Sequence, residues 1–268
     1  MKTLAFADPC FRNIESVVTI GVFDGLHRGH QKIVEQCVET ASELGCESVL
    51  ISFNINPKMA KGREMKLSSL MSVSSFEDFL AEKGVKYHCI IDFSDNMSKL
   101  TGEEFIALLC TSYRLRAMVV GSNFRCGNPS SSAGPAEIEK LLSEYTSSAF
   151  LKVVSPVLYN GMEVSSSLIR RCLLTGDTET ASALLGRAYQ VDLGEEAPGS
   201  SSERLLYSIR TLGQLLPKDG TYKTRVAGKA SDAPTSNPVD CDATAVISGD
   251  CLALELQVRI KPDRLFFL

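Results

Sequence analysis

The sequence has no tryptophan and only three histidines in 268 residues, and its nine cysteines include no Cys-x-x-Cys pair. An odd number of irregularly spaced cysteines indicates neither a zinc site nor a disulfide framework, so we interpret them as reduced core thiols. No apolar run reaches the roughly 18 residues that span a bilayer. The apolar stretch at the N-terminus is too short for a secretory signal. We therefore expect a soluble, cytoplasmic protein.

A long run of basic residues is also missing. The chain carries 28 Lys and Arg against 32 Asp and Glu, a formal net charge of -4. This weakly acidic balance makes sequence-independent binding of nucleic acid a poor interpretation, although it allows a local cationic pocket for phosphates. Hydrophobic residues at 44% and charged residues at 22% are ordinary values for a globular chain. We expect neither a nucleic acid nor a membrane as partner.

The first two-thirds of the chain alternates short β-branched runs with patterns of helical spacing. Predicted strands cover residues 17–21, 48–53, 87–93, 117–121 and 150–154. Predicted helices cover residues 30–44, 75–83 and 136–145, and a further helix begins with Thr101 as its N-cap. Strands separated by single helices predict an α/β fold, a Rossmann-like, mainly parallel sheet with helices on both faces. Such sheets bind ligands beyond the carboxyl ends of their strands.

The composition changes after two further predicted helices, at 166–174 and 178–185. A turn-rich linker covers 194–202, and short β-type runs follow it, interrupted by a loop at 228–242 that is rich in Ser, Asp and Pro. We predict two domains, a nucleotide-binding domain over 1–190 and a small C-terminal all-β module over 191–268.

The most informative segment is the decapeptide at 21–30, Gly-Val-Phe-Asp-Gly-Leu-His-Arg-Gly-His, which follows a predicted strand and opens a helix. Its glycines let the backbone approach a bulky anion, and the helix N-terminus adds free N–H groups and a partial positive charge. His27 and His30 supply donors for phosphoryl oxygens. No Gly-Lys-Ser/Thr follows, so it is not a P-loop. Structural histidines or a metal pair are the alternatives.

The same segment resembles the His-x-Gly-His signature of the nucleotidylyltransferase superfamily, and its Phe-Asp-Gly resembles the bacterial bifunctional riboflavin kinase/FAD synthetase family. Three further segments resemble that family in the same order. They are Val-Val-Gly-Ser-Asn-Phe-Arg-Cys-Gly at 119–127, Val-Ser-Ser-Ser-Leu-Ile-Arg at 164–170, and Gly-Asp at 176–177 with Leu-Leu-Gly-Arg-Ala-Tyr at 184–189. The resemblance covers roughly residues 15–190.

The resemblance implies transfer of AMP from ATP to FMN, which gives FAD and pyrophosphate, with Mg²⁺ accompanying ATP and its ligands unspecified. Residues implied to bind and activate the ATP phosphates are His27, His30, Ser166 and Arg170. Residues implied to shape the phosphate loop and the start of the later helix are Gly21, Phe23, Asp24, Gly25, Gly29, Ser165 and Ser167. Residues implied to lie near the flavin are Phe53, Asn54, Pro57, Asn123 and Arg125.

The sequence departs from the family after the second predicted strand. The family has Thr-Phe-Asp-Pro-His-Pro there, whereas this chain has Ser-Phe-Asn-Ile-Asn-Pro at 52–57, and Cys126 replaces a phenylalanine. Two alternatives to FMN adenylylation therefore stay open. One is a nucleotidylyltransferase for another phosphorylated acceptor, and the other is a non-catalytic flavin- or nucleotide-binding relative.

The C-terminal module resembles part of the family's riboflavin kinase module. Leu-Leu-Pro-Lys-Asp-Gly-Thr-Tyr at 215–222 follows the kinase pattern, but no Pro-Thr-Ala-Asn precedes it. The similar letters at 234–237 come later and inside a loop-like stretch. Glu255 corresponds either to the kinase base or to an exposed strand position. We predict a β remnant without kinase activity.

Overall fold

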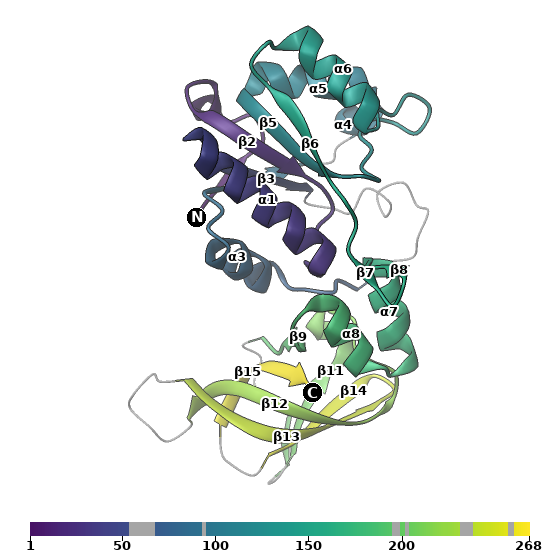
Figure 1. The fold of residues 1–268 in the computed structure, drawn as a ribbon. Helices are drawn as coiled ribbons and strands as arrows, with labels where there is room; N and C mark the ends of the chain where they lie inside the picture. Colours follow the sequence, from purple (N-terminus) through teal and green to yellow (C-terminus); the bar gives the residue numbers. More distant parts are fainter. Residues whose placement is uncertain (54–67, 93–94, 195–198, 202–203, 231–237, 257–259) are drawn as a thin grey trace. The chain divides into compact units, whose positions relative to one another are not determined.

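The computed structural model describes residues 1–53, 68–92, 95–194, 199–201, 204–230, 238–256 and 260–268 (Figure 1). Its contacts divide the chain into two compact units. The first unit contains Met1–Phe23, Gly29–Leu67 and Glu77–Leu158, and the second contains Asp24–Arg28, Ser68–Phe76 and Tyr159–Leu268. In this division, α7 (Ser166–Thr175), α8 (Thr178–Leu185) and two short segments of the N-terminal half group with the C-terminal strands.

The first unit contains a six-stranded sheet in the order β1-β4-β3-β2-β5-β6, and all of its neighbouring strands pair in parallel. The strands are β1 Lys2–Ala5, β2 Glu15–Ile20, β3 Glu47–Phe53, β4 Tyr87–Ile91, β5 Arg114–Gly121 and β6 Phe150–Val154. The predicted parallel α/β sheet is confirmed. β-branched residues fill its centre because central parallel strands are covered on both faces.

Helices cover both faces of this sheet (Figure 1). They are α1 Arg28–Leu44, α3 Val73–Glu82, α4 Asp95–Lys99, α5 Gly102–Ser112 and α6 Pro135–Tyr145, with a 3-10 turn η1 at Pro9–Arg12. One core lies between the sheet and α5, α6 and η1, and the other lies between the sheet and α1. Thr101 caps α5 as predicted, since its hydroxyl accepts from the Glu104 amide at 3.1 Å and the Glu104 carboxylate accepts from the Thr101 amide at 2.8 Å.

The second unit combines two helices with an antiparallel sheet. The helices are α7 Ser166–Thr175 and α8 Thr178–Leu185, and a short hairpin of β7 Leu158–Tyr159 and β8 Met162–Glu163 precedes them. The sheet order is β10-β11-β14-β13-β12-β15-β9. Its strands are β9 Tyr189–Asp192, β10 Gly199–Ser201, β11 Arg204–Ser208, β12 Gly220–Ala230, β13 Pro238–Ser248, β14 Cys251–Leu256 and β15 Ile260–Phe267, with α9 at Ile209–Leu212. The predicted C-terminal all-β region is confirmed.

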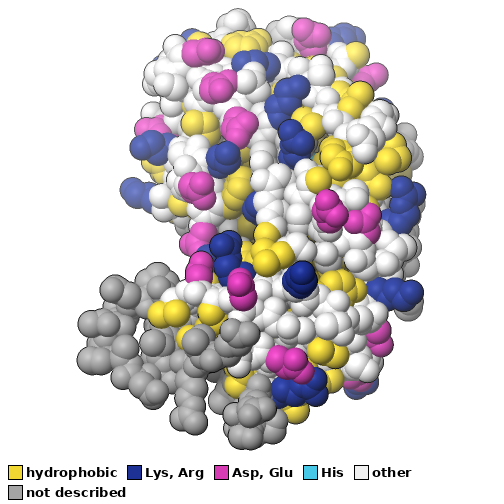
Figure 2. Space-filling model, turned by 60° about the horizontal axis from the view of Figure 1, so that its bottom comes forward, with side chains coloured by type: hydrophobic (Ala, Val, Ile, Leu, Met, Phe, Trp, Pro, Cys, Tyr) yellow, Lys and Arg dark blue, Asp and Glu magenta, His cyan; other side chains and the backbone are white. Residues whose placement is uncertain are grey.

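The segments predicted as linker and loop are shorter than expected. β10 lies within the predicted linker at 194–202, and β12 and β13 extend into the predicted loop at 228–242. The surface in Figure 2 carries described Lys and Arg side chains interspersed with Asp and Glu, in keeping with the mixed charge of the sequence. None of the helices in the described part is long and apolar enough to cross a membrane.

Candidate functional site

The glycine-rich segment at 21–30 connects β2 to α1, as its sequence predicted. Gly25 and Leu26 lie consecutively in the left-handed region, with φ of 79° and 40°. A residue with a Cβ atom adopts this conformation at a cost of about 1–2 kcal/mol. The Leu26 side chain is fully buried, with 0% of its surface exposed. Its burial therefore offsets the backbone strain just before His27.

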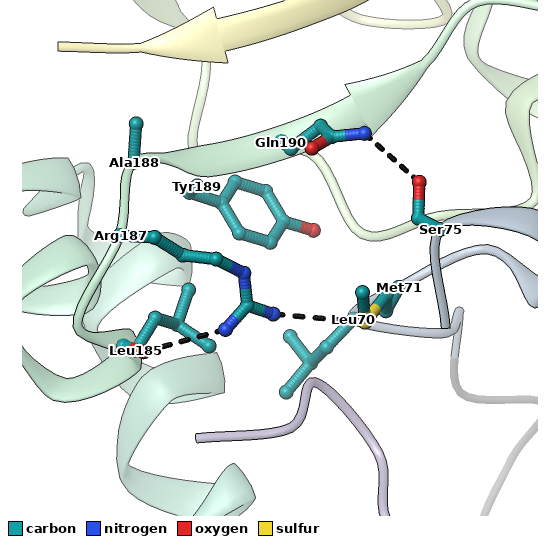
Figure 3. Close-up of a pocket in the computed structure, with 8 residues that line it drawn as sticks. All are labelled: Leu70, Met71, Ser75, Leu185, Arg187, Ala188, Tyr189 and Gln190. Carbon is teal, nitrogen blue, oxygen red and sulfur yellow. Dashed lines mark hydrogen bonds between the residues drawn. The ribbon is translucent and has the colours of Figure 1, made fainter. Parts of the chain in front are cut away.

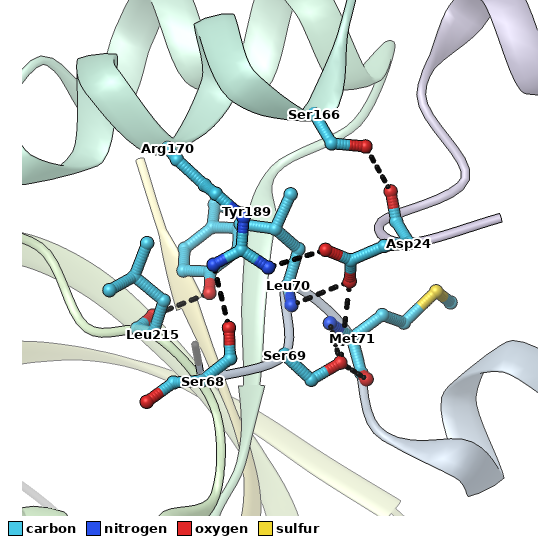
Figure 4. A network of polar contacts seen from close by, with 9 residues as sticks. All are labelled: Asp24, Ser68, Ser69, Leu70, Met71, Ser166, Arg170, Tyr189 and Leu215. Carbon is cyan, nitrogen blue, oxygen red and sulfur yellow. Dashed lines mark hydrogen bonds and ion pairs between the residues drawn. The ribbon is translucent and has the colours of Figure 1, made fainter. Parts of the chain in front are cut away.

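Arg170 on α7 lies against this turn within the second unit (Figure 4). Its Nη2 atom is 2.5 Å from the Asp24 carboxylate, and its Nη1 atom donates to the Ser68 carbonyl at 2.7 Å. The side chains of Asp24 and Arg170 are only 16% and 14% exposed. A charge-assisted contact shielded in this way is stronger than a pair in open solvent.

The Asp24 residue has three further partners. Its carboxylate accepts from the Leu70 amide at 2.9 Å and from the Ser69 hydroxyl at 3.4 Å. The Ser166 hydroxyl donates to the Asp24 carbonyl at 2.9 Å. The structure therefore brings together three residues that the sequence analysis had selected separately, Asp24, Ser166 and Arg170. Sequence reasoning did not identify residues 68–70, which lie outside the motifs compared with the family.

The positions of Ser166 and Arg170 follow from the caps of α7. The Ser165 hydroxyl accepts from the Leu168 amide at 3.3 Å, so Ser165 acts as the N-cap rather than as a free ligand. Ser167 is exposed in the first turn. Four residues separate Ser166 from Arg170, which places both on one helix face. Gly176, with φ of 85°, ends the helix.

Arg187 is a second arginine at the same turn, immediately after α8. Its Nη2 atom donates to the Gly25 carbonyl at 2.7 Å, and its Nη1 atom donates to the Leu26 carbonyl at 3.0 Å. Burial lowers the pKa of Arg187 to about 10, so the guanidinium is charged at neutral pH. The sequence analysis quoted Arg187 only as a letter of the Leu-Leu-Gly-Arg pattern and assigned it no contact. A basic residue after a helix-ending glycine is the only signal that pointed to it.

His27 follows the turn and is almost completely buried, with 6% of its surface exposed. Burial lowers the pKa of His27 to about 4, the Asp24 carboxylate raises it, and the Arg187 charge lowers it further. The imidazole is therefore neutral at physiological pH and has one N–H to donate. A neutral imidazole is a weaker hydrogen-bond donor to phosphate than the protonated imidazolium.

The flanks of the segment belong to the first unit. The Gly21 amide donates to the Ile51 carbonyl at 3.1 Å, which fixes the end of β2. The Phe23 ring meets the His30 ring edge to face, with centroids 5.3 Å apart, and a Cβ on Gly21 would lie 3.3 Å from the Phe23 ring. Phe23 therefore shapes the segment by packing. Gly29 lies in the first turn of α1.

The predicted flavin residues that the structure describes lie at the carboxyl end of β3 and beyond the carboxyl end of β5. Phe53 ends β3 and is partly buried against the core. Asn123 and Arg125 follow β5, and Arg125 donates from Nε to the Ser132 hydroxyl at 3.0 Å. β2 lies between β3 and β5 in the sheet, so one edge of the first unit carries these residues and the end of β2. Asn54 and Pro57 lie outside the described residues.

Three smaller observations concern the candidate residues. Cys126, which replaces the family phenylalanine, is buried, and burial raises the pKa of its thiol to about 12. Among the described residues, no group of three or more His, Cys, Asp and Glu side chains could hold a metal ion. The Asp24 carboxylate, the only acidic side chain of the glycine-rich segment, is committed to Arg170 and residues 69–70.

The sequence pattern that defines the FAD synthetase family matches residues 12–168. This chain belongs to the FAD synthetase family. The match contains the glycine-rich segment and the N-terminus of α7, the two elements that meet at Asp24 and Ser166.

Two curated relatives of this FAD synthetase family member are named for two activities, riboflavin kinase and FMN adenylyltransferase. It is 28% identical over 180 residues to the bifunctional riboflavin kinase/FMN adenylyltransferase of Buchnera aphidicola, covering 67% of this chain and 57% of the relative. It is 26% identical over 196 residues to that of Bacillus subtilis, covering 70% and 60%. The chain thus spans less than two-thirds of the length of both curated relatives.

A solved structure shares the whole fold of this family member. The crystal structure of a macrolide-efflux protein from Streptococcus pneumoniae superposes with a TM-score of 0.78 at 20% identity, over 99% of this chain and 88% of that chain. The likeness shows that one fold accommodates both sequences, and it carries no information on activity.

Proposed function

We propose that the protein is an FMN adenylyltransferase that transfers the AMP part of ATP to FMN and releases pyrophosphate. The observation that carries this proposal is the meeting of Asp24, Ser166 and Arg170 in a chain that belongs to the FAD synthetase family. FMN and ATP are the substrates. The nine free cysteines of the chain favour the reducing cytoplasm as its location.

The chemistry requires little proton transfer from the protein. An oxygen of the FMN phosphate, already anionic at neutral pH, attacks the α-phosphorus of ATP while the bond to the β-phosphate oxygen breaks. The protein must align the two anions and stabilise the charge that moves to pyrophosphate. Mg²⁺ bound with ATP would neutralise part of that negative charge.

Four side chains have assigned roles in this proposal. The neutral His27 donates its single N–H to a phosphate oxygen, and His30, three residues later, contacts the same polyphosphate. Ser166 donates a hydrogen bond from the start of α7. Arg170 exchanges its contacts with the Ser68 carbonyl and the Asp24 carboxylate for a bidentate contact with phosphate.

The test is formation of FAD and pyrophosphate from ATP, Mg²⁺ and FMN by the purified protein. We expect FAD from the wild-type protein and from Arg171→Met, an exposed neighbour of Arg170 that serves as the matched control. We expect loss of at least 100-fold in His30→Ala and Arg170→Met. Absence of FAD above the His30→Ala level would refute the proposal. Pyrophosphate release with another phosphorylated acceptor, or ATP binding without turnover, would support the alternatives instead.

We further propose that riboflavin kinase activity is absent. Glu255 is exposed on β14 and forms a surface ion pair with Arg204, which supports its interpretation as an ordinary strand position. The kinase-like motif makes contacts within the fold: the Lys218 amide donates to the Leu173 carbonyl at 2.9 Å, and the Tyr222 hydroxyl donates to the Lys218 carbonyl at 2.5 Å. Formation of FMN from riboflavin and ATP would overturn this second proposal.

A further inference from the structure

Arg187, which follows α8, donates hydrogen bonds to the glycine-rich segment as well as to the end of that helix. Two of its hydrogen bonds go to the carbonyls of Gly25 and Leu26, which lie 162 and 161 residues earlier in the sequence. A third goes to the Leu185 carbonyl at 3.3 Å, at the end of α8. An arginine that only capped α8 would need the third bond alone.

The surroundings of Arg187 hold the guanidinium in this orientation (Figure 3). The Nη2 atom lies 3.6 Å from the Met71 sulfur, and the side chain lines a small cavity with Leu70, Leu185 and Tyr189. Gly186, with φ of 72°, ends α8 just before Arg187 and sets the direction in which the side chain leaves the helix. The planar guanidinium fork can bond two successive carbonyls from one fixed position, which a lysine cannot do.

The turn that Arg187 contacts is the strained one. The carbonyls that accept its hydrogen bonds belong to the two consecutive residues with left-handed backbone conformation, Gly25 and Leu26. The next residue is His27, whose direction depends on the dihedral angles of this turn. The same guanidinium charge opposes protonation of the His27 imidazole.

We propose that Arg187 is a positioning residue for the phosphate-binding segment: by holding the Gly25 and Leu26 carbonyls it fixes the direction in which His27 presents its ring. This inference rests on the proposed adenylyltransferase function for its consequence in catalysis.

The experiment compares Arg187→Met, which removes the charge and the fork, with Arg187→Lys, which keeps the charge. Arg171→Met, on the exposed face of α7, is the matched control. FAD formation gives kcat and KM for ATP, and proton NMR gives the pKa of His27, since the chain has only three histidines to resolve. His27→Gln assigns the signal.

In Arg187→Met we expect kcat to fall roughly 10- to 100-fold, with a smaller change in KM. The reason is that a wrongly oriented His27 ring stabilises the transition state less than the correctly oriented ring. The pKa of His27 should rise by a small amount, because burial, the larger cause of its low pKa, remains when the Arg187 charge is removed. In Arg187→Lys the pKa should stay low while kcat still falls, because the charge remains and the two-carbonyl contact is lost. Arg171→Met should match the wild-type protein in both readouts.

The inference is overturned if folded Arg187→Met keeps the wild-type kcat and the wild-type pKa of His27. If Arg187→Met does not fold, Arg187→Lys decides, and wild-type kinetics in that variant overturn the inference. If the wild-type protein forms no FAD, the proposed function fails by itself. The pKa of His27 and amide hydrogen exchange at residues 25–27 then still test whether Arg187 holds the segment.

Discussion

Acid should destabilise the fold through His27, and His27→Gln should remove this effect. His27 is 6% exposed, and burial lowers its pKa from 6.5 to about 4. The unfolded chain therefore binds the proton more tightly than the folded chain between these pH values. The contribution of the neutral His27 ring to the free energy of unfolding is therefore complete above pH 6.5. This contribution decreases as the pH falls toward 4.

The size of the effect follows from the change in pKa. One pKa unit corresponds to about 1.4 kcal/mol, so a decrease of roughly 2.5 units corresponds to about 3 kcal/mol. Most of it should be lost between pH 7.5 and pH 4.5. Glutamine has a polar side chain of similar size that does not titrate in this range, so His27→Gln should be less sensitive to pH by about this amount.

The assay is urea unfolding followed by circular dichroism at pH 7.5 and pH 4.5, together with NMR titration of the histidine rings. His88 is the matched control, because burial also lowers its pKa but it lies in the first unit, on β4. His88→Gln should leave the titration of His27 unchanged. A His27 ring that titrates near pH 6.5 in the folded protein, or equal pH sensitivity in His27→Gln and wild type, would refute the reasoning.

Four further substitutions test the fold and the site. Asp24→Asn removes the charge that holds Arg170, and we expect kcat/KM for ATP to fall at least tenfold; unchanged kinetics would show that this pair does not prepare the arginine. Gly127→Ala places a Cβ atom 2.3 Å from a backbone nitrogen at φ of +89° and should cost about 3 kcal/mol or more by urea unfolding, whereas Gly45→Ala, with φ of +64° and open space, should cost about 1 kcal/mol. Equal costs would contradict the close approach. Thr101→Ala removes the capping hydroxyl of α5 and should lower the unfolding free energy by about 1 kcal/mol, and no change in urea would exclude that contribution.

Sequence patterns predicted the first sheet because its central strands are buried on both faces. The β-branched runs of β2, β3 and β5 are continuous for this reason, and each was predicted to within a few residues. β1 was missed, since it is a four-residue edge strand with mostly exposed side chains and has no such run. β15 was also missed, since it contains Pro262, a residue that reads as a strand breaker.

The sequence selected candidate residues for the site but none of the contacts between them. The resemblance to the family selected His27, Ser166 and Arg170 as candidates, and the helices predicted at 166–174 and 178–185 agree with α7 and α8. The pairing of Arg170 with Asp24 and the contact of Arg187 with Gly25 join residues 146 and 162 positions apart. Such contacts arise from tertiary packing, which a local sequence motif does not predict.

The chain passes between its two units five times, after residues 23, 28, 67, 76 and 158. No single cut can therefore yield one complete unit. A fragment ending at residue 158 would still contain Asp24 but would lack both arginines that bind its turn. Any piece of the chain that keeps this turn together with both of its arginines must therefore run at least from residue 24 to residue 187.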